Sequence, residues 1–220
     1  MPGVAPAPRS KTVDRDAERR PAKYNDQSPR LADGRTGEAD YCWLKGLRVA
    51  VQGLGNVGMP LCGYLSVAGA ALVVSDLDAN RCAQAAATYG ATVAAPEELH
   101  AQHVDVFAPA ALGAVLNDAT IPCLLCRVVC GGANNQLAEV RHDAALAVRG
   151  IVFVPDYLAN AGGVIDFHQE TIDDQPDAVL ASVARIGAIT RDVLRCAAAT
   201  GATPLSVADG IVRARIIRRA

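Results

Sequence analysis

Three glycines in the stretch VAVQGLGNVGMPLCGYL, residues 49–65, have a spacing that suits phosphate binding. Gly53, Gly55 and Gly58 form the pattern G-x-G-x-x-G between an apolar run and a segment with helical periodicity. The first glycine permits a tight turn, the second lets the backbone approach a pyrophosphate, and the third lets helix and strand pack closely. Free N–H groups and the helix dipole would then face the negative phosphates.

An acidic residue adds to this pattern. Asp76 ends the next apolar run, at the distance from the glycines where a carboxylate can bind the ribose hydroxyls. Its charge would repel a 2′-phosphate, which favours NAD over NADP. Asp78 is a second candidate for the same role, with capping of the following helix as the alternative. Together, the glycines and the acid favour a dinucleotide site over an empty turn.

Short apolar runs alternate with helical patterns along most of the chain. The expected strands lie at 47–53, 70–76, 104–110, 126–132 and 150–156. The expected helices lie at 59–69, 79–90, 135–150 and 176–199, with a final basic helix at 205–220. Asn80 is a possible cap of the second helix, and Gly69 and Gly90 are expected near helix ends. This alternation predicts an α/β fold, a Rossmann-type doubly wound parallel sheet with long C-terminal helices.

Residues 1–43 differ from the rest in composition. They carry charges of both signs and several prolines but almost no large apolar side chains. Such a segment cannot bury enough surface to offset its ordering entropy. We therefore expect a disordered or loosely attached N-terminal segment at 1–43 and a dinucleotide-binding domain at 44–220.

The overall composition excludes several classes of partner. Hydrophobic residues make up 51%, aromatic residues 4%, and the net charge is −2, so neither nucleic acid nor an anionic membrane is an expected partner. No apolar run has the length of a membrane span, and the first ten residues lack the apolar core of a signal peptide. We therefore expect a soluble, cytoplasmic protein.

The seven cysteines favour free thiols in a reducing compartment, because their number is odd and they lie in apolar runs. Cys123, Cys126 and Cys130 in CLLCRVVC are expected to be buried thiols and not zinc ligands, since no second ligand pair has finger-like spacing. The histidines His100, His103 and His168 show no metal-ligand spacing either, so we predict no metal site.

Four motifs resemble the Glu/Leu/Phe/Val dehydrogenases, and within them the leucine, valine and phenylalanine branch. They are GLRVAVQGLGNVG, DVFAPAALGAVLND, GGANNQL and PDYLANAGGVI, which occur in this order between about Leu44 and the C-terminus. The resemblance implies an NAD-dependent enzyme that oxidatively deaminates an L-amino acid, such as leucine, valine or phenylalanine, to the 2-oxo acid.

The resemblance also implies roles for single residues. It places the cofactor-binding loop and the ribose-binding acid at Gly53, Leu54, Gly55, Asn56, Val57, Gly58 and Asp76. Backbone contact beneath the nicotinamide is implied for Ala108, Pro109 and Ala110, and contact with the nicotinamide and its ribose for Asn134. Asn160 would bind the amino-acid end of the substrate, with room left by Gly162 and Gly163.

Simpler explanations exist for some of these residues. Asn134 and Asn135 precede a helical pattern and could be helix caps, and Asn160 before two glycines could be a turn residue. His142 is expected to have a satisfied or solvated side chain and no catalytic role.

No catalytic residue can be assigned in this chain. The family resembles two-domain enzymes whose N-terminal domain carries a catalytic lysine, a substrate-binding lysine and an aspartate. Here only about 43 residues precede the first expected strand, and Lys11 and Lys23 have no glycine-rich surroundings. We expect a chain truncated to the NAD-binding domain, with a non-catalytic dinucleotide-binding module and a degenerate remnant as alternatives.

A lone cofactor domain would expose the surface where a substrate domain docks. We therefore expect a homo-oligomer or a separate substrate-domain partner, with association through the long C-terminal helix and the segment after Asn160.

Overall fold

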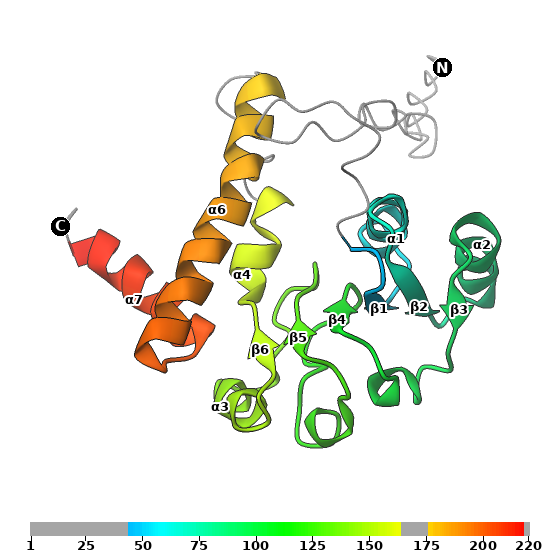
Figure 1. Ribbon diagram of the computed structural model, residues 1–220, viewed down its shortest axis with the longest axis horizontal. Helices are drawn as coiled ribbons and strands as arrows, with labels where there is room; N and C mark the ends of the chain where they lie inside the picture. The colour runs from blue at the N-terminus through cyan, green and yellow to red at the C-terminus, as the bar shows by residue number, and fades with distance from the viewer. Residues whose placement is uncertain (1–43, 164–175, 218–220) are drawn as a thin grey trace, which may run out of the picture. The chain divides into compact units, whose positions relative to one another are not determined.

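The structure, a computed structural model, describes residues 44–163 and 176–217. Six strands form one sheet in the order β3-β2-β1-β4-β5-β6, and every neighbouring pair is parallel (Figure 1). The strands are β1 (Arg48–Gln52), β2 (Ala71–Ser75), β3 (Thr92–Val93), β4 (Val106–Pro109), β5 (Val128–Val129) and β6 (Val152–Phe153). This order is that of the Rossmann fold, and its switch point lies between β1 and β4. The expected fold class is confirmed.

Successive residues of the central strands pack on opposite faces of the sheet. Val49 and Val51 of β1 join an apolar cluster with α1 (Gly58–Val67) and α2 (Ala79–Tyr89). Ala50, between them, belongs to a second cluster that includes Leu146 of α3 (Arg141–Val148). The 3₁₀ turns η2 (Leu99–Ala101) and η3 (Ile121–Cys123) pack into this second cluster. Both faces of the sheet are thus covered, as parallel strands require.

The helix α2 shows how local sequence sets its ends. The Asp78 carboxylate accepts a hydrogen bond of 2.9 Å from the Asn80 N–H, so Asp78 is the N-cap and the prediction of Asn80 as cap was wrong. Gly90 ends the helix in the left-handed conformation, with φ of 65°, as expected.

The helix expected at 135–150 begins later than its pattern indicated, at Arg141. Residues before it pair sideways with the loop after β4 instead of forming a helical turn. Leu116 donates its N–H to the Gln136 carbonyl at 3.0 Å, and the Ala138 N–H donates to the Leu116 carbonyl at 2.9 Å. Asn134 and Asn135 therefore do not cap this helix.

Two long helices complete the chain, α6 (Pro176–Thr200) and α7 (Pro204–Ile217). The expected helix at 176–199 is confirmed; α6 contacts the short helix α4 (Asp156–Ala159), and α7 contacts β6. Only the later part of α6 is well buried. Val193 is 2% exposed, whereas Val183 and Ile189 are 37% and 40% exposed.

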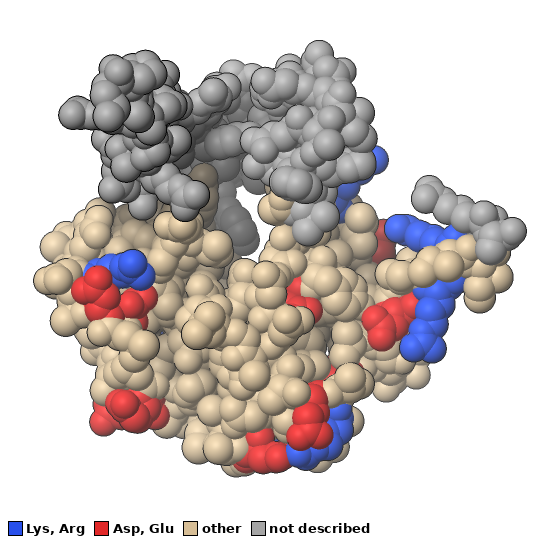
Figure 2. Space-filling model, turned by 180° about the vertical axis from the view of Figure 1, so that it is seen from behind, with Lys and Arg blue, Asp and Glu red and all other residues tan. Residues whose placement is uncertain are grey.

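The surface of the described part carries charges of both signs. In Figure 2, acidic and basic side chains lie in small mixed groups on this face. None of the described helices combines the length and apolar character that a bilayer span needs. Residues 1–43 and 164–175, to which the expected N-terminal disorder and part of the expected association surface belong, lie outside the described residues.

The described cysteines are free thiols in different environments. Cys62 is buried and Cys126 and Cys130 are half-buried, but Cys123 is exposed, so the expected burial of all three CLLCRVVC thiols was wrong for Cys123. Burial raises the pKa of Cys62 and of Cys126 to about 11. A thiolate, which is the reactive form, is therefore disfavoured at both positions.

This difference predicts the order of alkylation. In native protein at pH 8, iodoacetamide should modify Cys123 and Cys196, which are both exposed, and leave Cys62 and Cys126 unmodified until a denaturant is added. Peptide mass spectrometry over time measures this. Labelling of Cys62 as fast as Cys123 in native protein would contradict the fold.

Candidate functional site

Three loops meet at the carboxyl edge of the sheet beside the switch point. They follow β1, β4 and β5, and they approach one another closely at glycines. A Cβ atom at Gly131 would lie 2.2 Å from the Pro109 carbonyl oxygen, and one at Gly132 would lie 2.6 Å from Cγ1 of Val57. Such approaches are possible only for glycine. The sequence-predicted residues of all three loops are thus brought together.

The loop after β1 has the geometry that its glycine pattern predicts. Gly53 has a φ of +90° and donates its N–H to the Ser75 carbonyl at 2.7 Å. A Cβ at Gly58 would lie only 1.8 Å from the Gly53 carbonyl oxygen. Helix α1 therefore starts directly against the turn. Its N-cap residue, Val57, makes no side-chain capping bond. Met59 donates its N–H to the Gly55 carbonyl at 3.2 Å, and Pro60 has no N–H. Gly58 therefore provides the first-turn N–H for an external acceptor.

Asp76 follows β2 and lies against the same loop. Its carboxylate accepts hydrogen bonds from the N–H of Leu54 at 2.5 Å and from the N–H of Asp78 at 2.8 Å. Arg81 lies 3.8 Å away. Partial burial acts to raise the pKa of Asp76, but the two N–H groups and the guanidinium outweigh it and hold the pKa below its usual value. The residue is therefore charged at neutral pH.

A pocket of about 510 Å³ opens beside Asp76, between the segments that follow β2 and β3. Its walls include Leu77, Val93, Ala94 and Pro96. Leu77 is 93% exposed, so its apolar side chain is open to solvent at the edge of the pocket. These wall residues were not predicted from the sequence. The only signal for them was the apolar character of the residues that follow the two strands.

The segment from Ala108 to Ala110 divides between strand and loop. Ala108 lies inside β4 and is 2% exposed, whereas Pro109 ends the strand. Ala110 follows at the edge and donates its N–H to the Gln52 carbonyl at 2.8 Å. Only Pro109 and Ala110 are thus close to the loops that form the edge.

Asn134 and Asn160 lie together, although 26 positions separate them. The Asn160 side-chain amide donates a hydrogen bond to Oδ1 of Asn134. Asn160 is also the C-cap of α4, so this helix positions its side chain. A Cβ at Gly162 or Gly163 would meet no atom of the described residues within 4 Å.

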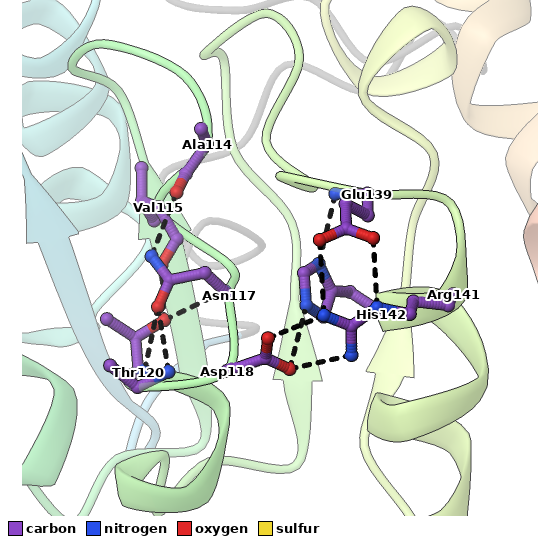
Figure 3. A network of polar contacts seen from close by, with 9 residues as sticks. Ala114, Val115, Asn117, Asp118, Thr120, Glu139, Arg141 and His142 are labelled. Atoms are coloured by element: carbon purple, nitrogen blue, oxygen red, sulfur yellow. Dashed lines mark hydrogen bonds and ion pairs between the residues drawn. The ribbon is translucent and has the colours of Figure 1, made fainter.

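A second polar group joins the loop after β4 to the start of α3 (Figure 3). The ligand-type atoms of Asp118, Glu139 and His142 lie within 4.8 Å of one another, and they are the only such group of three in the part of the chain that the structure describes. Arg141 already occupies the place of a cation. It makes two hydrogen bonds to Asp118, at 2.7 and 2.5 Å, and two to Glu139, at 2.9 and 3.1 Å.

His142 is satisfied at both ring nitrogens. Its Nδ1 accepts the Glu139 N–H at 3.0 Å, and its Nε2 lies 3.2 Å from Oδ1 of Asp118. The backbone donor requires Nδ1 to be unprotonated, so Nε2 carries the proton and donates it. The expectation of a satisfied side chain is confirmed, and we interpret the group as an ion-pair network that holds two loops together.

The contact at Gly58 makes a direct prediction. Gly58→Ala should destabilise the fold by about 2 kcal/mol, because the methyl group forces the first turn of α1 away from Gly53. Urea unfolding measures this. The matched control is Gly187→Ala in α6, where a Cβ meets nothing within 4 Å and the helix propensity of alanine should stabilise by up to about 1 kcal/mol. Equal effects of the two substitutions would contradict the close packing.

The ion-pair network of Asp118, Glu139, Arg141 and His142 predicts that the free energy of unfolding depends on pH. Hydrogen bonds from Arg141 and His142 lower the pKa of Asp118 to about 2, below its value in an unfolded chain of about 4. The stabilisation is therefore present above pH 4 and is lost as the pH falls towards 2. Asp118→Asn should lower the unfolding free energy at pH 7, with a difference that shrinks over this range.

Asp192→Asn is the control for this experiment, because Asp192 makes only a loose, exposed pair of 3.8 Å with Arg195. Its effect should be small at every pH. An Asp118→Asn effect that stays constant down to pH 2.5 would show that the network does not stabilise the charged carboxylate.

Comparisons with known proteins agree with this geometry. Residues 74–179 match the family model described as Glutamate/Leucine/Phenylalanine/Valine dehydrogenase. The leucine dehydrogenase of Bacillus subtilis (strain 168) is 39% identical over 175 residues, which cover 80% of this chain and 48% of that protein.

Solved structures give the same result. The crystal structure of L-tryptophan dehydrogenase from Nostoc punctiforme aligns with a TM-score of 0.77 at 40% identity, over 80% of this chain and 53% of that one. Hetero-hexameric glutamate dehydrogenase from Thermus thermophilus aligns with a TM-score of 0.58 at 25% identity, over 75% and 44%. The chain spans about half the length of the relatives it matches. These matches, together with the sheet order and loops described above, support the glutamate/leucine/phenylalanine/valine dehydrogenase family for the matched part of the chain.

Proposed function

We propose that this chain binds NAD across the carboxyl edge of its sheet, as the cofactor-binding part of an NAD-dependent amino-acid dehydrogenase. The observation that carries the proposal is the meeting of three glycine-packed loops with the Asp76 carboxylate beside the switch point. In open α/β sheets, ligands bind in the crevice at this position.

The edge offers a suitable group for each part of the adenosine end. The pyrophosphate would lie over the open end of α1, where Val57 makes no capping bond. The adenine would fill the pocket beside Asp76 and cover the apolar side chains of Leu77 and Val93, which are 93% and 48% exposed. The ribose hydroxyls would donate to Asp76.

The charge of Asp76 supports NAD over NADP. Because its pKa is held below the usual value, the carboxylate would repel a 2′-phosphate at neutral pH. Arg81 lies close enough to reduce this repulsion, but its guanidinium is shared with Asp78 at 3.6 Å.

Asn134 and Asn160 support the assignment of the other end. We propose that Asn134 holds the nicotinamide and its ribose, with Pro109 and Ala110 beneath them, and that Asn160 holds the amino-acid end of the substrate. Bound NAD would supply the hydride acceptor for the substrate α-carbon, and the addition of water with release of ammonium would complete the conversion to the 2-oxo acid. The proposed substrates are L-amino acids such as leucine, valine or phenylalanine, and the names of the matched leucine, phenylalanine and tryptophan dehydrogenases support this class.

The reaction also needs a proton-transfer group of suitable pKa at the reacting carbon. Among the described residues the only lysine is Lys45, which precedes β1 and so lies at the opposite edge of the sheet. We therefore propose that a substrate-binding domain outside the described residues supplies this chemistry, through a partner chain that carries it. The matched hetero-hexameric glutamate dehydrogenase supports assembly as a route.

Calorimetric titration with NAD and NADP tests the cofactor proposal. The parent chain should bind NAD more tightly than NADP. Asp76→Asn keeps an oxygen for the Leu54 N–H but removes the charge, so it should weaken NAD binding about tenfold and reduce the preference over NADP. Asp76→Ala also releases the loop and should weaken binding further. A folded chain that binds no NAD at millimolar concentration would refute the proposal.

A non-catalytic dinucleotide-binding module is the second candidate function. It is favoured because Lys45, the only lysine among the described residues, lies at the edge of the sheet opposite the proposed NAD site. It predicts the same NAD binding without turnover. Formation of NADH from NAD and L-leucine, L-valine or L-phenylalanine by the purified chain distinguishes the two functions.

A further inference from the structure

Gln136 is a completely buried polar side chain beneath the loop that carries Asn134. Its Nε2 donates hydrogen bonds to the carbonyls of Gly131 at 2.8 Å and Ala133 at 2.9 Å. These two carbonyls belong to the three residues that precede Asn134 in the chain. A buried amide is costly unless its polar groups are used, and within the described residues Oε1 of Gln136 has no partner. The side chain is therefore placed for its two donors, which hold the loop closed.

The backbone of Gln136 joins this loop to two further elements. Its N–H donates to Oδ2 of Asp156 at 3.1 Å, and its carbonyl accepts from Leu116 in the loop after β4 at 3.0 Å. The other oxygen of Asp156 accepts the Tyr157 N–H at 2.8 Å, within the first turn of α4. Asp156 thus connects the start of α4 to the Asn134 loop.

A hydrogen bond at the far end of α4 closes the ring. The Asn160 N–H donates to the Asp156 carbonyl at 2.8 Å, and its side-chain amide donates to Asn134. The ring therefore runs from Asn134 through Gln136 and Asp156 to Asn160 and back. The Gln136 amide donates to carbonyls of its own loop, and the Asp156 carboxylate accepts from two backbone N–H groups. The ring shares no residue with the adenosine end around Asp76.

From this geometry we propose that Gln136 and Asp156 are positioning residues for the nicotinamide end of the cofactor. They act through Asn134 and Asn160, whose side chains they hold in one arrangement, and they do not contact the ligand themselves. This inference rests on the proposed NAD-binding function. It adds that the two ends of the proposed NAD site are held in place independently, the adenosine end by Asp76 and the nicotinamide end by Gln136.

The test compares two ligands that share the adenosine half. ADP retains the adenine, its ribose and the pyrophosphate but lacks the nicotinamide and the second ribose. Gln136→Met keeps the length of the side chain and removes its two donors, so it should weaken NAD binding about tenfold and change ADP binding by less than about twofold. Calorimetry on the full chain measures both affinities. Equal weakening of both ligands, or no change in either, would overturn the positioning role.

The Asp156 variants give an independent measurement if Gln136→Met does not fold. Asp156→Ala removes the acceptor of the Gln136 N–H and should show the same selective loss, whereas Asp156→Asn keeps one acceptor oxygen and should restore part of the NAD affinity. An unselective loss for Asp156→Ala, or no rescue by Asp156→Asn, would also overturn the role.

Thr203→Val is the stability control, since it removes a hydrogen bond of 2.5 Å to Asp143 that lies outside the ring. It should lower stability and leave both affinities unchanged. If the parent chain binds neither ligand, the proposed function fails and the positioning role with it. If the parent binds both and the variants behave like the parent, only the positioning role fails.

Discussion

The carboxyl edge of this sheet depends on the approach of Gly58 to the carbonyl of Gly53, where a Cβ atom would lie only 1.8 Å from the oxygen. This contact starts α1 directly against the turn after β1. It also brings Val57 into the space beside Gly132, so the loop after β5 can pack against the first loop. The packing of backbone on backbone leaves little room for alternative loop positions. A ligand that binds there would meet groups that are already in place, which lowers the ordering cost of binding.

The two ends of this edge are held by different means. At the adenosine end a charged carboxylate, Asp76, accepts backbone N–H groups from its own segment and from the glycine loop. At the other end a neutral amide, Gln136, donates to backbone carbonyls. The charge of Asp76 is compensated by two backbone N–H donors and by Arg81. Gln136, by contrast, is completely buried, and an isolated charge there would be costly. The ion pairs of Asp118 with Arg141 support the loop after β4 from its outer side.

Much of this organisation is visible in the sequence, and the rest depends on long-range contacts. The G-x-G-x-x-G pattern and Asp76 are local in sequence, so their geometry follows from a strand, a turn and a helix. The start of α3 at Arg141 was missed because residues before it pair with Leu116, a contact that helical periodicity does not reveal. Gln136 was missed for the same reason: its partners lie in its own loop and at Asp156, and its burial depends on the packed sheet. The pocket beside Leu77 required the end of β3, a strand of two residues with no distinct sequence signal.

Backbone amide chemical-shift mapping of the isotope-labelled chain during titration with NAD tests most directly whether NAD binds at the carboxyl edge of the sheet. We expect saturable shifts confined to the loop after β1, the Asp76 segment and the loops after β4 and β5, with α7 unaffected. Shifts that map to α6 and α7, or none at saturating NAD in a folded sample, would contradict it.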